Sequence, residues 1–130
     1  YALVEAEPEL AIIPLSRHDR CMHLPEMFRD LVNRLRNPLP LGTKALTSIA
    51  ARNHGCLRRD QGYTAAMLVA ESRMLQVSIF QTLHLHVEDT KPGVLLMYIM
   101  AIADEVDSQL AQAMKSYISE AKLDAEPIVA

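Results

Sequence analysis

The segment His54–Thr64, with the sequence HGCLRRDQGYT, decides how this chain folds. It has the pattern of a helix that ends, a tight turn at Gly62 and a second helix that folds back along the first. His54, Arg58 and Gly62 follow one another at four-residue intervals, and Glu71 comes two turns into the second helix. Because the turn is short, it predicts two antiparallel helices in which His54 and Arg58 face Glu71.

Helical periodicity covers most of the remaining chain. The expected helices are residues 17–36, 43–59, 65–86 and 92–122, and the second of them begins at Gly42 or Thr43. Ser16 and Thr64 are suitable N-caps. Pro25 must kink or restart the first helix, because proline lacks a backbone donor and clashes with the preceding turn. Four helices joined by short loops predict an all-α fold, an antiparallel four-helix bundle with a long C-terminal helix.

The expected faces of the second and fourth helices follow from spacing. On the second helix the core side is predicted to consist of Leu46, Ile49, Ala50, Asn53 and Leu57. On the fourth helix the core stripe is Ile99, Ala103, Val106, Leu110, Ala113 and Tyr117. This stripe advances in steps of four and three, a heptad rhythm that favours near-parallel packing against partner helices. The charged residues expected on its solvated face are Asp104, Glu105, Asp107, Lys115, Glu120 and Lys122.

The predicted domain organisation is simple. Residues 1–15 contain two prolines without a sustained period and are expected to form an arm or a short irregular helix. Residues 16–122 form the helical bundle, and residues 123–130 form a tail or a linker to a following domain. Because the chain begins with Tyr1 rather than Met, we allow that it is a piece of a longer polypeptide.

Composition excludes several classes of protein. A length of 130 residues suits one domain, and a net charge of −3 argues against a nucleic-acid partner, which requires a basic face. The longest uncharged apolar run, Gly93–Ala103, is far shorter than the roughly 20 residues of a membrane span. No secretory signal precedes the first helix. Cys21 and Cys56 are expected to be reduced thiols, which fits a cytoplasmic protein.

The polar set His54, Arg58 and Glu71 has three open interpretations. It forms a buried, hydrogen-bonded cluster that fixes the turn, because a charge removed from water must be paired. Alternatively it lines a pocket for a ligand or signal. In the third interpretation His54 accepts a phosphoryl group, since Arg58 follows one helical turn later. The structural cluster is favoured over the other two.

Other reactive residues do not form a recognisable site in the sequence. His84 and His86 project to different sides of a helix, and His18, Cys21 and His23 have no acidic partner at metal-site spacing. We therefore predict neither a metal nor a cofactor. The sequence also contains no P-loop, nucleophile elbow, zinc-protease motif or catalytic carboxylate pair. The chain is accordingly predicted not to be an enzyme as an isolated domain.

Three short motifs lie in order along the chain: the Leu24-Pro25 helix start, the His54–Tyr63 corner, and the returning segment Leu68–Leu75 around Glu71. In this order they resemble the amino-terminal domain of RsbR-type co-antagonists and related sensor histidine kinases, the RsbRD N-terminal-like family. The resemblance extends over residues 17–121.

The resemblance implies a non-catalytic sensory or dimerisation input domain of bacterial two-component or stress-response signalling. Such a domain is cytoplasmic and dimeric, and it acts on a kinase or STAS output domain that is covalently linked or a separate partner. The residues carried over are His54, Arg58, Gly62 and Glu71. The alternatives are a histidine phosphotransfer module that uses His54 and a free-standing helical scaffold.

We also predict a parallel-ordered homodimer that uses apolar surface on the first or fourth helix. The fourth helix has apolar residues outside its stripe: Leu95, Leu96, Met100 and Ile102. Its C-terminal half also extends past the shorter helices and exposes Leu110, Ala113, Met114, Tyr117 and Ile118. Either the N-terminal arm or a second subunit must cover this overhang, and the second subunit is preferred.

Overall fold

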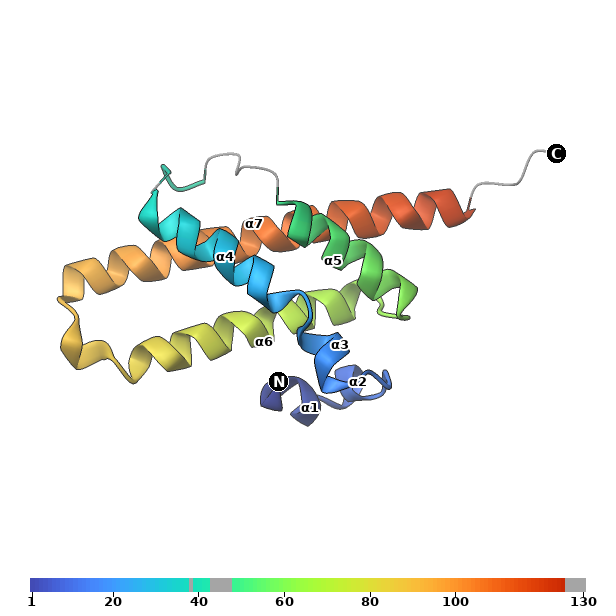
Figure 1. Cartoon of the computed structure of the whole chain (residues 1–130), viewed down its shortest axis with the longest axis horizontal. Coiled ribbons are helices and arrows are strands. Elements are labelled where there is room, and N and C mark those ends of the chain that lie inside the picture. Colours follow the sequence, from blue (N-terminus) through green and yellow to red (C-terminus); the bar gives the residue numbers. More distant parts are fainter. Residues whose placement is uncertain (38, 43–47, 126–130) are drawn as a thin grey trace.

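The computed structural model describes residues 1–37, 39–42 and 48–125, with side chains up to residue 120, and all regular elements among them are helices (Figure 1). The predicted all-α fold class is therefore confirmed. The more specific prediction of an antiparallel four-helix bundle stays a prediction. The elements are α1 (Ala2–Ala6), α2 (Pro8–Ala11), α3 (Arg17–Cys21), α4 (Leu24–Arg36), α5 (Ile49–Asp60), α6 (Ala65–His84), η1 (Val87–Asp89) and α7 (Pro92–Ala125).

Local sequence signals explain where several helices begin and end. Ser16 caps α3 by accepting a hydrogen bond from the Asp19 backbone N–H at 3.1 Å, and Thr64 caps α6 in the same way. Gly62 has a φ of +92°, the left-handed conformation expected of the turn between α5 and α6. At Pro25 the chain restarts as α4, with the proline in the first turn, instead of continuing α3.

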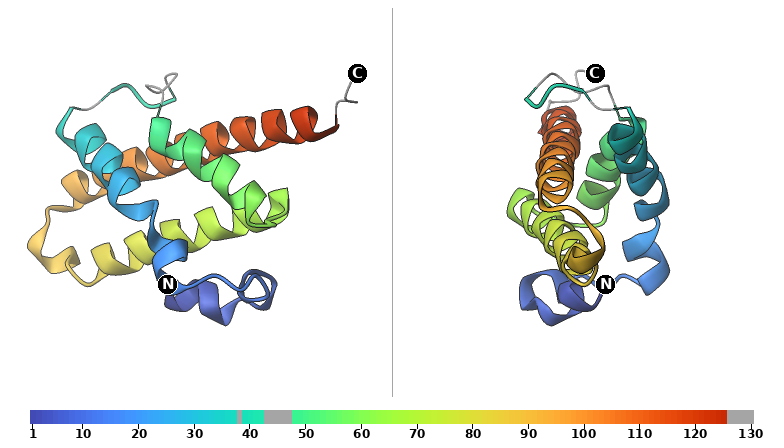
Figure 2. Two further views of the ribbon diagram at one scale, coloured as in Figure 1. Left: turned by 45° about the vertical axis from the view of Figure 1, so that its right-hand side comes forward. Right: turned by 90° about the vertical axis from the view of Figure 1, so that its left-hand side faces the viewer.

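The pair α6 and α7 forms the frame of the molecule. The two helices lie side by side, run in opposite directions and are joined through η1 (Figure 1). Both α4 and α5 contact α7, and in Figure 2 they lie on one side of this pair. The helix α7 has 34 residues and runs to Ala125, past the expected end at Lys122. Residues 126–130 of the predicted tail lie outside the described residues.

The helices α5 and α7 approach each other closely at Gly55. A Cβ atom on Gly55 would overlap the carbonyl oxygen of Ala113 and lie 2.9 Å from its Cα. Both residues are buried. Gly55 is therefore required for helix packing, because any side chain at this position would push α5 away from α7.

The buried side of α5 differs from the prediction. Ile49 is 71% exposed and Asn53 is exposed, so the predicted core side is wrong at these positions. The buried residues of α5 are Ala51, His54, Gly55 and Arg58. Small residues permit the close approach to α7, and the polar ones are buried because they find partners on other helices. This helix is predicted to begin at Gly42 or Thr43 and to have Leu46 on its core side. Thr43 and Leu46 belong to residues 43–47, which lie outside the described residues.

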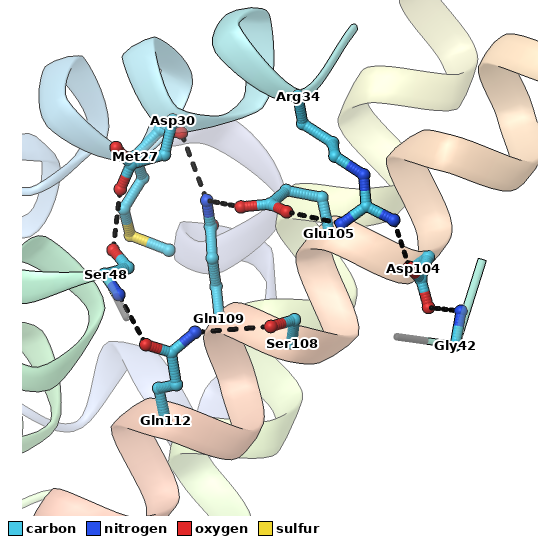
Figure 3. A network of polar contacts seen from close by, with 10 residues as sticks. All are labelled: Met27, Asp30, Arg34, Gly42, Ser48, Asp104, Glu105, Ser108, Gln109 and Gln112. Atoms are coloured by element: carbon cyan, nitrogen blue, oxygen red, sulfur yellow. Dashed lines mark hydrogen bonds and ion pairs between the residues drawn. The ribbon is translucent and has the colours of Figure 1, made fainter. Parts of the chain in front are cut away.

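The predicted solvated face of α7 is also wrong in part. Glu105 is buried and Asp104 is half-buried, because Arg34 of α4 reaches both, at 3.3 Å and 2.5 Å (Figure 3). Gln109 donates one turn further along to the Met27 carbonyl at 3.2 Å. These bonds join α4 to α7 through polar groups that sequence periodicity assigns to solvent.

Apolar packing near this network corrects another expectation. Ile102, predicted to lie outside the core stripe, is 2% exposed and packs with Leu31 and Val106. The overhang of α7 is covered in part within the chain. Ala113 is buried against α5, and the Tyr117 hydroxyl donates to the Tyr63 carbonyl at 2.7 Å. Neither the arm nor a second subunit is needed at these two positions.

The N-terminal segment packs against α6 and contributes one residue, Leu10, to the core. The expected arm, residues 1–15, contains the short helices α1 and α2, and both contact α6. Leu10 is fully buried in a cluster with Tyr63 and Met67. None of the described helices is long and apolar enough to cross a membrane.

Candidate functional site

Arg58 is the centre of a buried polar cluster between α3, α5 and α6. Its side chain is 0% exposed. Nε donates to Glu71 at 3.0 Å, one terminal nitrogen donates to the Gln61 side chain at 2.7 Å, and the other donates to the Arg20 carbonyl at 2.6 Å. The guanidinium therefore ties the end of α5 to α6 and to the end of α3.

Glu71 receives hydrogen bonds at both carboxylate oxygens. One oxygen accepts from Arg58 and from His54 Nε2, the latter at 2.9 Å, and the other accepts from the Tyr63 hydroxyl at 2.7 Å. Burial alone would raise the pKa of Glu71, but the His54 hydrogen bond and the charge of Arg58 lower it to about 2. The predicted pairing of His54 and Arg58 with Glu71 is present. Burial, with the charge and hydrogen bond of Glu71, raises the pKa of Tyr63 to about 12.

His23 joins the cluster from the junction between α3 and α4. Its ring stacks on that of His54 with centroids 3.8 Å apart and planes 17° apart. Burial and the nearby charge of His54 lower the pKa of His23 to about 3, so this imidazole is neutral at pH 7. His54 is only 6% exposed, and its Nδ1 has no hydrogen-bond partner among the described residues.

Arg20 is the second buried arginine of the cluster. It donates to the Tyr63 hydroxyl at 3.0 Å and to the carbonyl oxygens of Leu10 and Ile13 at 3.0 Å and 2.5 Å. These bonds connect the N-terminal helices with the α5–α6 corner. Tyr63 lies between Arg20 and Glu71 and joins both arginines into one network.

A cavity of about 190 Å³ opens beside this cluster. Its walls are mainly apolar and include Leu24, Met27, Phe28, Leu68, Leu75 and Leu110. Arg20, His23, His54, Glu71 and Ser72 line it as well. Because an apolar cavity of about 150 Å³ accommodates benzene, this one has room for a molecule with a single ring. The arrangement is that of a ligand pocket with apolar walls and a few convergent polar groups.

His23, His54 and Glu71 are also a possible metal-ligand set, since one ligand atom of each lies within 4.8 Å of the others. The stacked rings disfavour this use. A metal must lie near the plane of each imidazole that binds it, and the planes of two stacked, nearly parallel rings cannot both contain it. The Arg58 guanidinium beside Glu71 would also repel a cation. Metal binding would therefore require one ring to rotate and Arg58 to leave.

The burial of His54 bears on the phosphoacceptor interpretation. Phosphoryl transfer requires a ring nitrogen that the donor can reach, but Nε2 binds Glu71 and Nδ1 is enclosed. The same geometry agrees with a structural cluster that forms one wall of a pocket.

Sequence reasoning missed three members of the cluster: Arg20, His23 and Tyr63. Arg20 lies near the end of α3 and His23 lies in the break between α3 and α4, where helical periodicity is interrupted. Their approach to the corner depends on tertiary packing. Tyr63 belongs to the segment His54–Thr64, and its position directly after Gly62 is the one feature of the sequence that places it near the cluster.

No protein-family model matches the chain, and comparisons with curated proteins and with solved structures find no match. The resemblance to RsbR-type amino-terminal domains therefore rests on the quoted motifs alone.

Proposed function

We propose that this chain is a non-catalytic input domain of a bacterial signalling protein, in which the cavity beside the Arg58 cluster binds a small molecule. The cavity carries the proposal, since it combines an apolar interior with polar groups at one side. In this proposal α4, α5, α6 and α7 act as an antiparallel four-helix unit in the cytoplasm. The output domain is a kinase or STAS domain, covalently linked or a separate partner.

The position of the cavity supports a sensory role. The residues that line it come from α1, α3, α4, α5, α6 and α7. A ligand that fills it adds contacts to all of these helices at once. Because α7 passes the cavity at Gln109, Leu110 and Ala113, a change in its packing there alters the position of its C-terminal half.

Dimerisation is the second part of the proposal. The first turns of α7 expose several large apolar side chains, although Ile102 of the same helix lies in the core. The outer face of α7 consists of Val94, Leu96, Met97 and Met100, which are 39%, 58%, 67% and 44% exposed. Each of them lies three or four residues from another member (positions 94 and 97, 97 and 100, 96 and 100), so together they form one contiguous surface. Such a surface is suited to the same surface of a second copy.

Ligand binding is tested with a variant that fills the cavity. Ser72 is a lining residue of α6, and Ser72→Phe places a ring where the ligand would lie. Ser119→Phe is the matched control, because Ser119 is exposed on α7 and does not line the cavity. Ligand-observed NMR with a set of single-ring compounds should show binding to the wild type and to Ser119→Phe, but not to Ser72→Phe. Equal binding by all three proteins would contradict a ligand role for this cavity.

A further inference from the structure

The charges around the cavity are not balanced within the described part of the chain. The connected cluster contains two buried arginines, Arg20 and Arg58, but Glu71 is the one carboxylate among its described side chains. Arg58 forms the ion pair with Glu71. Among the residues that the structure describes, Arg20 has no ion pair with a carboxylate.

Arg20 is 7% exposed, so water compensates its charge only weakly. Its hydrogen-bond partners among the described residues are the Tyr63 hydroxyl and two backbone carbonyl groups, which are dipoles without a net charge. Buried charges in proteins are as a rule paired with an opposite charge, because transfer of an isolated ion from water is strongly unfavourable. The two arginines and Glu71 therefore leave one positive charge in excess, and Arg20 lines the cavity.

The cavity offers a second feature that a ligand must match. Most of the remaining lining is apolar and consists of leucine, methionine, phenylalanine, valine and alanine side chains, together with Tyr1, Cys21, Ser78 and Gln109. A small inorganic anion would leave this apolar surface without a partner. A molecule with an apolar body and one anionic group satisfies both features.

We infer that the cavity binds a small, mainly apolar organic acid, whose ring or branched chain fills the apolar part and whose carboxylate provides the counter-charge to Arg20. This inference rests on the proposed ligand-binding function and names the chemical class of its ligand. The carboxylate is oriented towards the side of the cavity that contains Arg20 and His23.

The experiment uses three probes of nearly equal shape: benzoate, benzyl alcohol and benzylamine. At pH 7 their head groups are anionic, neutral and cationic. Dissociation constants for the wild type, measured by ligand-observed NMR titration, should show benzoate binding about tenfold or more tightly than benzyl alcohol, as expected of a charge-assisted hydrogen bond. Benzylamine should bind most weakly.

Two variants assign the effect to the cavity and to Arg20. Ser72→Phe should abolish binding of all three probes. Arg20→Gln keeps hydrogen-bond donors for the neighbouring carbonyl groups but removes the charge, so the preference for benzoate should disappear while benzyl alcohol still binds. Arg17→Gln is the matched control, because Arg17 is an exposed arginine of the same helix, α3. It should retain the wild-type order.

The outcomes separate the two proposals. Tighter binding of benzyl alcohol or benzylamine that Ser72→Phe abolishes would overturn the organic-acid inference and leave the ligand-binding function standing. A preference for benzoate that survives Ser72→Phe would overturn the inference by placing the anion elsewhere. Absence of binding by all three probes would overturn both. Circular dichroism shows whether Arg20→Gln folds. If it does not, the measurements on the wild type still decide the order of affinities for the three probes.

Discussion

At the residue scale, the molecule depends on one carboxylate. Glu71 accepts hydrogen bonds from His54, Arg58 and Tyr63, and through them it holds together α5, α6 and the turn between them. The sequence allowed the contacts of Glu71 with His54 and Arg58 to be predicted, because a short turn brings the near ends of two helices together. Arg20 and His23 could not be predicted, because their distance from the corner is set by how α3 and α4 pack and not by local spacing.

Replacement of Glu71 should be strongly destabilising. Glu71→Gln leaves the fully buried Arg58 without its counter-charge, and loss of one partner of a buried ion pair costs about 3–5 kcal/mol. Urea denaturation measures the free energy of unfolding. Glu88→Gln, at an exposed glutamate, is the control and should change it by less than about 0.5 kcal/mol. In the double variant Glu71→Gln/Arg58→Met, the loss in the free energy of unfolding should be smaller than the sum of the losses in the two single variants.

Stability should fall in acid, in two steps with different causes. The folded pKa of His23, about 3, lies below its unfolded value of 6.5, so the unfolded chain binds this proton first and stability declines as pH falls below 6.5. The folded pKa of Glu71, about 2, lies below its unfolded value of 4.5, so its contribution is present above pH 4.5 and is lost towards pH 2.

The two steps are separated with a histidine variant. His23→Phe removes the first group and should flatten the free energy of unfolding between pH 6.5 and pH 4.5, while the later decline remains. His84→Phe, which replaces an exposed histidine of α6, should keep the wild-type profile. An unchanged slope in His23→Phe between these pH values would show that His23 is not the group that titrates.

At the element scale, helix ends could be predicted better than helix faces. Ser16, Gly62 and Thr64 mark ends because capping and left-handed turns depend on a few neighbouring residues. The face of α5 could not be predicted from apolar periodicity, since its buried side contains small and polar residues. Gly55 is the clearest example. In the sequence it weakens the helix, whereas in the fold it permits the contact with α7.

Gly55→Ala should therefore destabilise the protein despite the higher helix propensity of alanine. The added methyl group meets the Ala113 backbone, and overpacking of this kind costs about 1–3 kcal/mol. Gly93→Ala is the matched control within a helix, because no atom lies within 4 Å of a Cβ there. It should be neutral or stabilising by up to about 1 kcal/mol. Thermal denaturation of both variants measures the difference, and equal effects would contradict the close packing of α5 on α7.

At the scale of the whole molecule, the outer face of α7 is an exposed apolar surface among the described residues. The prediction of extra apolar surface on this helix holds for Leu96 and Met100 but not for Ile102, which the core absorbs. Sequence periodicity could not separate these residues, because a helix end that is apolar on all sides has no preferred face.

The proposed dimer is tested by changing this outer face. Sedimentation equilibrium of the wild type at tens of micromolar should give twice the chain mass of 14.5 kDa. Leu96→Glu combined with Met97→Glu should give the monomer mass, because two charges would be buried in the interface. Ile49→Glu, at an apolar residue of α5 that is 71% exposed, should remain dimeric. A wild type that sediments as a monomer would contradict this part of the proposal.

The central claim, that the cavity beside the Arg58 cluster holds a small molecule, is tested most directly by methionine methyl NMR. Of the seven methionines, Met27 and Met74 line the cavity, whereas the others do not: Met22, Met67, Met97, Met100 and Met114. Titration of ¹³C-methyl-methionine protein with benzoate should shift the resonances of Met27 and Met74 in a saturable manner and leave those of Met97 and Met100 in place. Saturable shifts confined to Met97 and Met100, or no shift at Met27 and Met74 with benzoate, benzyl alcohol or benzylamine, would contradict the claim.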